Sequence, residues 1–157
     1  MSSVVSNFAF SVRDLAQSVN FYAEVFGFIA VGARRRTGEA VEPLVEVPGA
    51  VLEIQFMRNE DTFIELFSFV EPGRLTDGTH RPLNQVSGVH LAMCVDDLMK
   101  AGTAVERNGG TVHWGSRISL EMSGREAAEF MYCFDPNGIR IELMSHSART
   151  RDALNAH

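Results

Sequence analysis

The chain has 157 residues, of which 45% are hydrophobic and 22% are charged, with a formal net charge of -6 and a pI near 5.3. This composition is typical of a globular protein of one domain or two small modules, and its acidity argues against nucleic-acid binding, which needs a basic face. The N-terminus shows no secretory leader and no apolar run reaches the length of a membrane span, so we expect a cytoplasmic protein that does not bind membranes.

The first predicted elements are a strand and a helix. Residues 7–12 alternate, with two phenylalanines and a valine on one face, which is typical of a strand. Asp14 then caps a helix whose apolar residues recur at helical spacing, and Gly27 ends it. Three further strands are predicted in this half, over residues 29–36, 51–57 and 63–68.

The second half of the chain follows the same order. Residues 89–95 alternate as an opening strand, Asp96 or Asp97 caps the next helix, and the run 108–110 stops that helix. Further strands are predicted over residues 111–117, 128–134 and 140–145. Both cysteines, Cys94 and Cys133, lie in apolar strand-like contexts and are interpreted as buried free thiols.

The two halves align in sequence. "VRDL" aligns with "VDDL" at an offset of 83 residues, and the same offset carries Asn7 onto His90. "FIELFS" and "RIELMS" resemble each other and put Glu65 opposite Glu142. The pattern indicates an internal duplication of a βαβββ module, and modules of this size would share sheet edges or a cleft to bury enough surface.

The predicted organisation is one α+β unit made of these two modules. The first covers residues 5–70 and the second residues 88–146. A linker of Pro, Gly and polar residues, 71–87, joins them, and a charged tail follows at 147–157.

Four polar residues recur at matching positions of the modules. Asn7 and His90 begin the first strand of each, and Glu65 and Glu142 lie in the last. A carboxylate among apolar neighbours is costly to bury unless it is paired, protonated or bound to a metal. A hydrogen-bonded histidine or a solvated glutamate would explain any one of them alone, but their recurrence in both halves favours a metal site.

Three stretches, "VRDLAQSVNFYAEVFGF", "GVHLAMCVDDL" and "DPNGIRIELM", resemble the vicinal oxygen chelate superfamily, which has the glyoxalase and bleomycin-resistance fold. The resemblance covers about residues 5–146. It implies an α+β fold in which two tandem βαβββ modules form a curved mixed sheet around a central cleft. It also implies a small-molecule substrate and a homodimer.

In metal-dependent members of that superfamily the ligands come from the first and last strands of each module. Carried over, the ligands are Asn7, Glu65, His90 and Glu142, a set that resembles those of glyoxalase I and methylmalonyl-CoA epimerase. Asn7 departs from the family, where His or Gln is usual. The resemblance implies one divalent ion (Ni, Co, Mn, Fe, Zn or Mg) that binds vicinal substrate oxygens and stabilises an enolate or oxyanion, with Glu65 and Glu142 as candidate catalytic bases.

Three functions of such a site compete. A glyoxalase-like lyase, epimerase or isomerase is favoured because a second carboxylate, Glu65, is available as a base. An extradiol-type dioxygenase uses two histidines and one glutamate, and Asn7 in place of the first histidine argues against it. A non-catalytic protein that binds an antibiotic is the third, and the other three ligand residues argue against it.

Segments 34–43 and 118–129 are expected to be loops that shape the substrate pocket. Their arginines, and one nearby, are candidates to bind an anionic substrate, although solvent exposure explains each of them singly: Arg34, Arg36, Arg117 and Arg125. A second group is a candidate apolar lining, which core packing explains equally well: Phe56, Phe67, Trp114, Met122 and Phe130.

Overall fold

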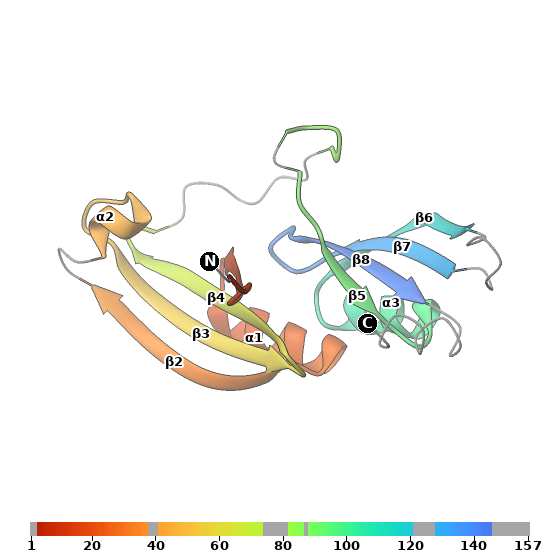
Figure 1. The fold of residues 1–157 in the computed structure, drawn as a ribbon, viewed down its shortest axis with the longest axis horizontal. Helices are drawn as coiled ribbons and strands as arrows, with labels where there is room; N and C mark the ends of the chain where they lie inside the picture. Colours follow the sequence, from red (N-terminus) through yellow and green to blue (C-terminus); the bar gives the residue numbers. More distant parts are fainter. Residues whose placement is uncertain (1–2, 38–40, 74–81, 87, 121–127, 146–157) are drawn as a thin grey trace. The chain divides into compact units, whose positions relative to one another are not determined.

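The computed structural model describes residues 3–37, 41–73, 82–86, 88–120 and 128–145 (Figure 1). The chain divides into two compact units, residues 1–79 and 80–157, which we call unit 1 and unit 2. Each unit contains one four-stranded mixed sheet. In the part of the chain described, no helix is both long and apolar enough to cross a membrane.

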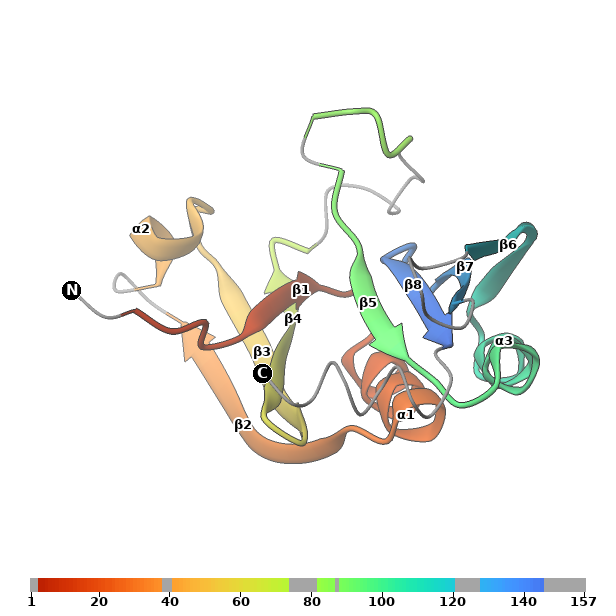
Figure 2. The ribbon, with the colours of Figure 1, turned by 45° about the vertical axis from the view of Figure 1, so that its right-hand side comes forward.

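Unit 1 begins with a strand and a helix and ends with a long hairpin. Its elements are, in chain order, β1 (Phe8–Ser11), α1 (Leu15–Phe26), β2 (Ile29–Thr37), α2 (Glu42–Val45), β3 (Val51–Asn59) and β4 (Thr62–Glu71). The strand order in the sheet is β1-β4-β3-β2, in which β1 runs parallel to β4 and the other neighbours are antiparallel (Figure 2).

Unit 2 repeats this topology. Its elements are β5 (Leu91–Cys94), α3 (Leu98–Arg107), β6 (Thr111–Leu120), β7 (Ala128–Phe134) and β8 (Arg140–Ser145). The strand order is β5-β8-β7-β6, again with one parallel pair, β5 beside β8. The predicted α+β fold with two βαβββ modules is confirmed; the predicted bounds of modules and linker stay predictions, and the tail 147–157 lies outside the described residues.

Both main helices begin at the predicted aspartates. The Asp14 carboxylate accepts a hydrogen bond from the Gln17 backbone N–H at 2.9 Å, and Asp97 accepts from two backbone N–H groups at 2.9 and 3.0 Å. These bonds satisfy donors that the first turn of a helix leaves free. Gly27 ends α1 at φ 69°, a left-handed conformation that glycine adopts without a side-chain penalty.

Helix α1 covers one face of the unit 1 sheet. The Phe10 ring stacks on Tyr22 of the helix with centroids 6.2 Å apart, and Phe10 lies opposite Leu66 in the β1–β4 register. Ile64 and Leu66 are completely buried. Because side chains alternate along a strand, Glu65 between them points to the opposite face of the sheet.

Helix α3 covers the matching face of the unit 2 sheet. Met131 and Leu143 are completely buried, as is Val105 of the helix. A Cβ atom placed on Gly102 would lie 2.6 Å from the indole ring of Trp114, so the glycine lets this ring pack directly on the helix. Trp114 therefore packs against α3 and donates a hydrogen bond from Nε1 to Glu106 at 2.9 Å, but it is 38% exposed and so does not belong to the buried core.

Three features differ from the sequence-based expectations. The strand predicted over residues 29–36 is confirmed and extends to Thr37, and β6 extends to Leu120, so the predicted loops 34–43 and 118–129 are partly strand. The short helix α2 was not predicted, because four residues that include a proline show no helical periodicity. The prediction that both cysteines are buried is wrong for Cys94, which is exposed: its strand β5 is an edge strand, paired only with β8 among the described residues.

Candidate metal centre and substrate pocket

The first half of the predicted metal site forms within unit 1. Ala9 lies opposite Glu65 in the parallel β1–β4 pair, which places Asn7, two residues earlier, beside the carboxylate. The Asn7 amide Nδ2 donates a hydrogen bond to Glu65 Oε2 at 3.0 Å in a partly buried setting. The structure therefore brings the first two predicted ligands together.

The second half forms at the same place in unit 2. Ala92 lies opposite Glu142 in the parallel β5–β8 pair, and His90 again comes two residues before the paired alanine. His90 Nε2 and Glu142 Oε2 are 3.4 Å apart, with their side chains 36% and 19% exposed. Asn7 and His90 are thus structural equivalents, as are Glu65 and Glu142.

The donor atoms of the second pair suit a divalent ion. Two ligands bound at about 2.1 Å to one ion lie about 3.0 Å apart in octahedral and about 3.4 Å apart in tetrahedral geometry. The His90–Glu142 spacing of 3.4 Å falls at the upper end of this range. One imidazole with carboxylate and amide oxygens is a donor set that first-row divalent metals accept.

Neither pair alone provides three metal-ligating side chains. Among the described residues, no group of three or more His, Cys, Asp or Glu side chains gathers to hold a metal ion. The binding of one ion by all four residues stays a prediction: Asn7, Glu65, His90 and Glu142.

Tyr132 belongs to the unit 2 half-site and was not among the predicted site residues. It lies opposite Glu142 in the β7–β8 pair, and its ring meets the His90 ring edge-on with centroids 5.8 Å apart. The pKa of Tyr132 is raised above its ordinary value, first because burial disfavours the phenolate, then because the Glu142 carboxylate repels it and accepts the hydrogen bond of the phenol. The signal in the sequence is the short turn between the last two strands: if Phe134 and Arg140 pair across it, Tyr132 pairs with Glu142.

Five of the predicted residues line one pocket in unit 1. The pocket has a volume of about 400 Å³ and lies on the face of the sheet opposite α1, where α2 forms one wall. It contains the predicted ligand Glu65 and four residues predicted to bind substrate: Arg34, Arg36, Phe56 and Phe67. The strand alternation explains their meeting, because Phe56 pairs with Glu65 and Arg34 and Arg36 follow on the same face of β2.

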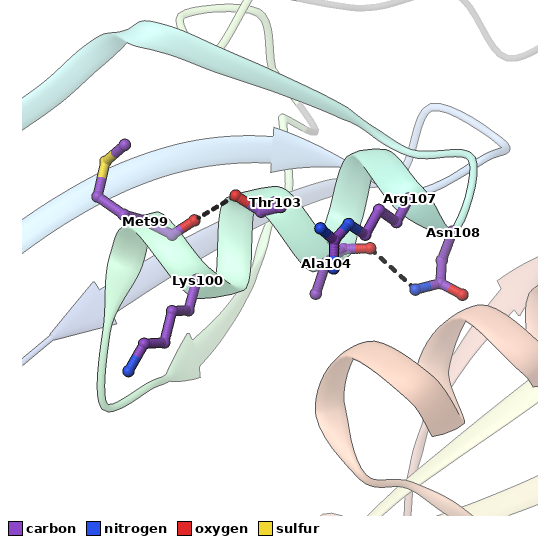
Figure 3. Close-up of a pocket in the computed structure, with 6 residues that line it drawn as sticks. All are labelled: Met99, Lys100, Thr103, Ala104, Arg107 and Asn108. Carbon is purple, nitrogen blue, oxygen red and sulfur yellow. Dashed lines mark hydrogen bonds between the residues drawn. The ribbon is translucent and has the colours of Figure 1, made fainter.

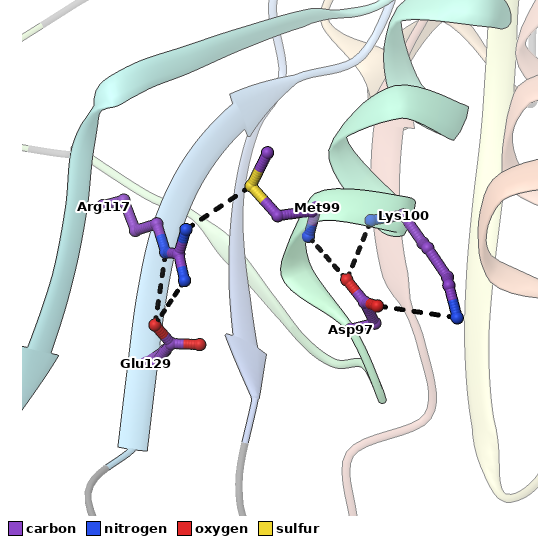
Figure 4. A network of polar contacts seen from close by, with 5 residues as sticks. All are labelled: Asp97, Met99, Lys100, Arg117 and Glu129. Atoms are coloured by element: carbon purple, nitrogen blue, oxygen red, sulfur yellow. Dashed lines mark hydrogen bonds and ion pairs between the residues drawn. The ribbon is translucent and has the colours of Figure 1, made fainter.

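The other residues predicted to bind substrate do not join this pocket. Arg117 forms an ion pair with Glu129 at 2.7 Å and donates to Met99 Sδ at 3.5 Å, so its guanidinium lies beside α3 (Figure 4). Met122 and Arg125 lie outside the described residues. Phe130 pairs with Met144 one row beyond Tyr132 and is partly buried.

A second hollow, of about 500 Å³, runs along the exposed side of α3 (Figure 3). Two of its polar side chains bond to the helix itself, Thr103 to the Met99 carbonyl and Asn108 to the Ala104 carbonyl, each at 2.9 Å. It contains none of the predicted site residues, and we assign it no role.

The chain matches the family model described as the Glyoxalase/Bleomycin resistance protein/Dioxygenase superfamily over residues 5–143. No protein with a curated description matches it. Among solved structures it is similar to a glyoxalase family protein from Bacillus cereus, with 19% identity, 90% of this chain and 93% of that chain covered, and a TM-score of 0.76.

Two further solved structures are similar to the chain. The trypanothione-dependent glyoxalase I of Leishmania major is 16% identical, with 99% of this chain and 95% of that one covered and a TM-score of 0.62. The fosfomycin resistance protein FosX of Listeria monocytogenes, in complex with Mn(II) and sulfate, is 13% identical, with 96% and 98% covered and a TM-score of 0.58. At such identities these likenesses establish the fold alone.

Proposed function

The chain belongs to the glyoxalase/bleomycin resistance protein/dioxygenase superfamily, and from this premise we propose that it is a metal-dependent lyase, epimerase or isomerase acting on a small molecule with two vicinal oxygens. One observation carries the proposal. The two sheets place an acid, Glu65 or Glu142, opposite an alanine in the same parallel register, with an amide or imidazole two residues before that alanine. A chance pairing of polar residues would not repeat in register.

We propose that Glu65, His90 and Glu142 hold one divalent ion, with Asn7 as a weaker fourth ligand. When bound, the ion supplies the fixed positive charge that stabilises an enolate or oxyanion. The Asn7–Glu65 hydrogen bond of 3.0 Å orients the Glu65 carboxylate and leaves its second oxygen, Oε1, able to accept a proton. The same proposal includes a homodimer of two copies of this chain.

Both glutamates stay candidate bases in this proposal. Glu142 faces the His90 imidazole at 3.4 Å and lies opposite Tyr132 in the β7–β8 pair. Glu65 accepts a hydrogen bond from the Asn7 amide at 3.0 Å. Each carboxylate therefore has a polar neighbour within its own unit that can orient it for proton transfer.

A second candidate function is binding without turnover. The unit 1 pocket, with its apolar lining and two arginines, would hold a small molecule even in a protein that performs no chemistry. An extradiol-type dioxygenase is less favoured, because Asn7 supplies an amide where that chemistry uses a second histidine.

Metal content of single variants tests the proposal. We expect about one divalent ion per chain after reconstitution with Mn, Co, Ni, Fe or Zn, measured by elemental analysis. Glu65→Gln and Glu142→Gln should each weaken metal binding at least about tenfold. Glu129→Gln is the matched control, because Glu129 lies on β7 and is paired with Arg117 beside α3. No bound metal in the wild type, or equal loss in the control, would remove the assignment.

A substrate screen with the reconstituted protein separates the candidate reactions. It should include hemithioacetals, 2-methyl-branched acyl-CoAs and catechols, with oxygen uptake followed in parallel. Solvent proton exchange without oxygen uptake supports the lyase or isomerase, and oxygen consumption with catechols supports the dioxygenase. Tight binding of an aromatic antibiotic with no turnover supports the binding protein.

A further inference from the structure

We propose that the substrate is a small apolar anion, with its anionic group held by Arg34 and Arg36 and its reacting oxygens close to Glu65. This inference rests on the proposed function only for the role of Glu65. The shape and charge of the unit 1 pocket support the rest independently.

The pocket has charged residues at its two ends. The strand register places Glu65 in one row across the sheet, Arg34 in the next row and Arg36 in the row after it. A strand rises about 3.3 Å per residue, so rows on one face are about 7 Å apart. The backbone rows of Arg34 and Arg36 therefore lie about 7 and about 13 Å along the strands from the Glu65 row. The Arg34 guanidinium turns back toward Gly32, which is in the Glu65 row, so Arg36 marks the far end of the pocket.

The lining between these ends is apolar. Val41, Leu52 and Ile54 form a buried cluster, and Phe56 and Phe67 pack against it partly buried. A volume of about 400 Å³ is within the range of small-molecule sites. The middle of the ligand is therefore hydrocarbon or aromatic, because a polar segment there would lose its bonds to water without replacement.

The two arginines are available to bind an anion. Among the described residues neither guanidinium forms an ion pair, and Arg34 makes one hydrogen bond, to the Ala33 carbonyl at 2.8 Å. Arg35 between them points to the other face of the sheet and is paired with Glu53 at 2.9 Å. Among the described residues, the two pocket-facing members of the Arg34-Arg35-Arg36 run are thus the ones whose charge no carboxylate neutralises.

Electrostatics fixes the orientation of such a ligand. Arg34 and Arg36 are two residues apart on one face, so their charges repel, and an anion between them removes the repulsion and accepts charge-assisted hydrogen bonds. The Glu65 carboxylate at the other end repels the same anion. The acid group therefore binds at the arginine end.

Binding of a matched acid and amide tests the inference. The probes are 4-phenylbutanoate and the neutral 4-phenylbutanamide, titrated by calorimetry into the full chain in the presence of EDTA. We expect the wild type to bind the acid at least about tenfold more tightly than the amide, since a charge-assisted bond contributes more than about 1.4 kcal/mol. Arg34→Gln and Arg36→Gln should lose this preference, Arg36→Lys should keep part of it, and Arg35→Gln should keep all of it.

Three results would overturn the proposal: no binding of the acid, equal binding of acid and amide by the wild type, or the same loss of preference in Arg35→Gln. Circular dichroism of each variant checks that the exposed substitutions leave the fold intact. Because EDTA removes any metal, this test is independent of the metal measurement. Failure of metal binding with success here would leave an anion-binding pocket, and the reverse would leave a metal enzyme with another substrate class.

Discussion

The turn that precedes β8 allows a sharp prediction about stability. Asp135 is 3% exposed, and its Oδ1 accepts hydrogen bonds from the backbone N–H groups of Asn137 and Ile139, each at 2.8 Å. Its Oδ2 accepts from the Asn137 side-chain amide at 2.9 Å. These bonds hold the turn from which β8, the strand of Glu142, begins.

Replacing Asp135 by alanine leaves two backbone donors without their acceptor. An unsatisfied donor costs about 1–2 kcal/mol here, where the site is partly closed to water, so Asp135→Ala should lower the free energy of unfolding by about 2–4 kcal/mol. For a chain of this size a loss of about 3 kcal/mol corresponds to a decrease in Tm of roughly 6–12 °C. Asp135→Asn should cost only about 1 kcal/mol, because its amide oxygen can replace Oδ1 and keep both backbone bonds.

Urea unfolding at neutral pH, followed by far-UV circular dichroism and extrapolated linearly to water, measures both variants. The comparison separates loss of the turn's acceptor from loss of its charge. If Asp135→Ala costs less than about 1 kcal/mol, or if Asp135→Asn costs as much as Asp135→Ala, then the two backbone bonds do not hold this turn and the reasoning is refuted.

Four further predictions concern thiols and helix ends. Cys94 is exposed and Cys133 buried, so a thiol reagent should titrate one thiol per native chain and two per unfolded chain; two fast native thiols would contradict this. Burial raises the pKa of Cys133 from 9.0 to about 12. The stability that its neutral thiol contributes is therefore complete below pH 9 and lost as the pH rises toward 12. Between these pH values the free energy of unfolding of Cys133→Ala should fall less steeply than that of the wild type. Gly27→Ala places an alanine at φ 69°, where an added Cβ atom has no neighbour within 4 Å, so only backbone strain should result. The substitution should lower the free energy of unfolding in urea by about 1–2 kcal/mol, and an unchanged value would contradict this. Hydrogen bonding from the Lys100 backbone N–H lowers the pKa of Asp97 below 3.8. The stability that this cap contributes is therefore present above about pH 4 and lost as the pH falls. The free energies of unfolding of the wild type and Asp97→Ala should become equal in acid.

Local patterns in the chain predicted the elements well. The caps at Asp14 and Asp97 and the stop at Gly27 were predictable because a helix end is decided by a few neighbouring residues. The duplication was predictable because "VRDL" and "VDDL" precede similar helices, and "IEL" recurs in the last strand of each half. Both sheets then form with the same strand order.

The environments of single side chains were less predictable. Trp114 and Arg117 were both candidates for a substrate pocket, yet the first packs on α3 and the second pairs with Glu129. The β6–β7 register breaks between His113 and Ile118, so strict alternation through this stretch gives the wrong face. Exposure of Cys94 likewise depends on which strands flank its own.

The sequence by itself determined the βαβββ duplication and the equivalence of Glu65 with Glu142, because strand periodicity and repeat alignment are properties of the chain order. Only the tertiary structure decided what meets those carboxylates. Cross-strand register placed Tyr132 against Glu142 and turned Arg34 and Arg36, but not Arg35, toward the pocket that holds Glu65. Register is decided by turns and by the packing of whole sheets, and a shift of one residue would move every one of these side chains to the other face.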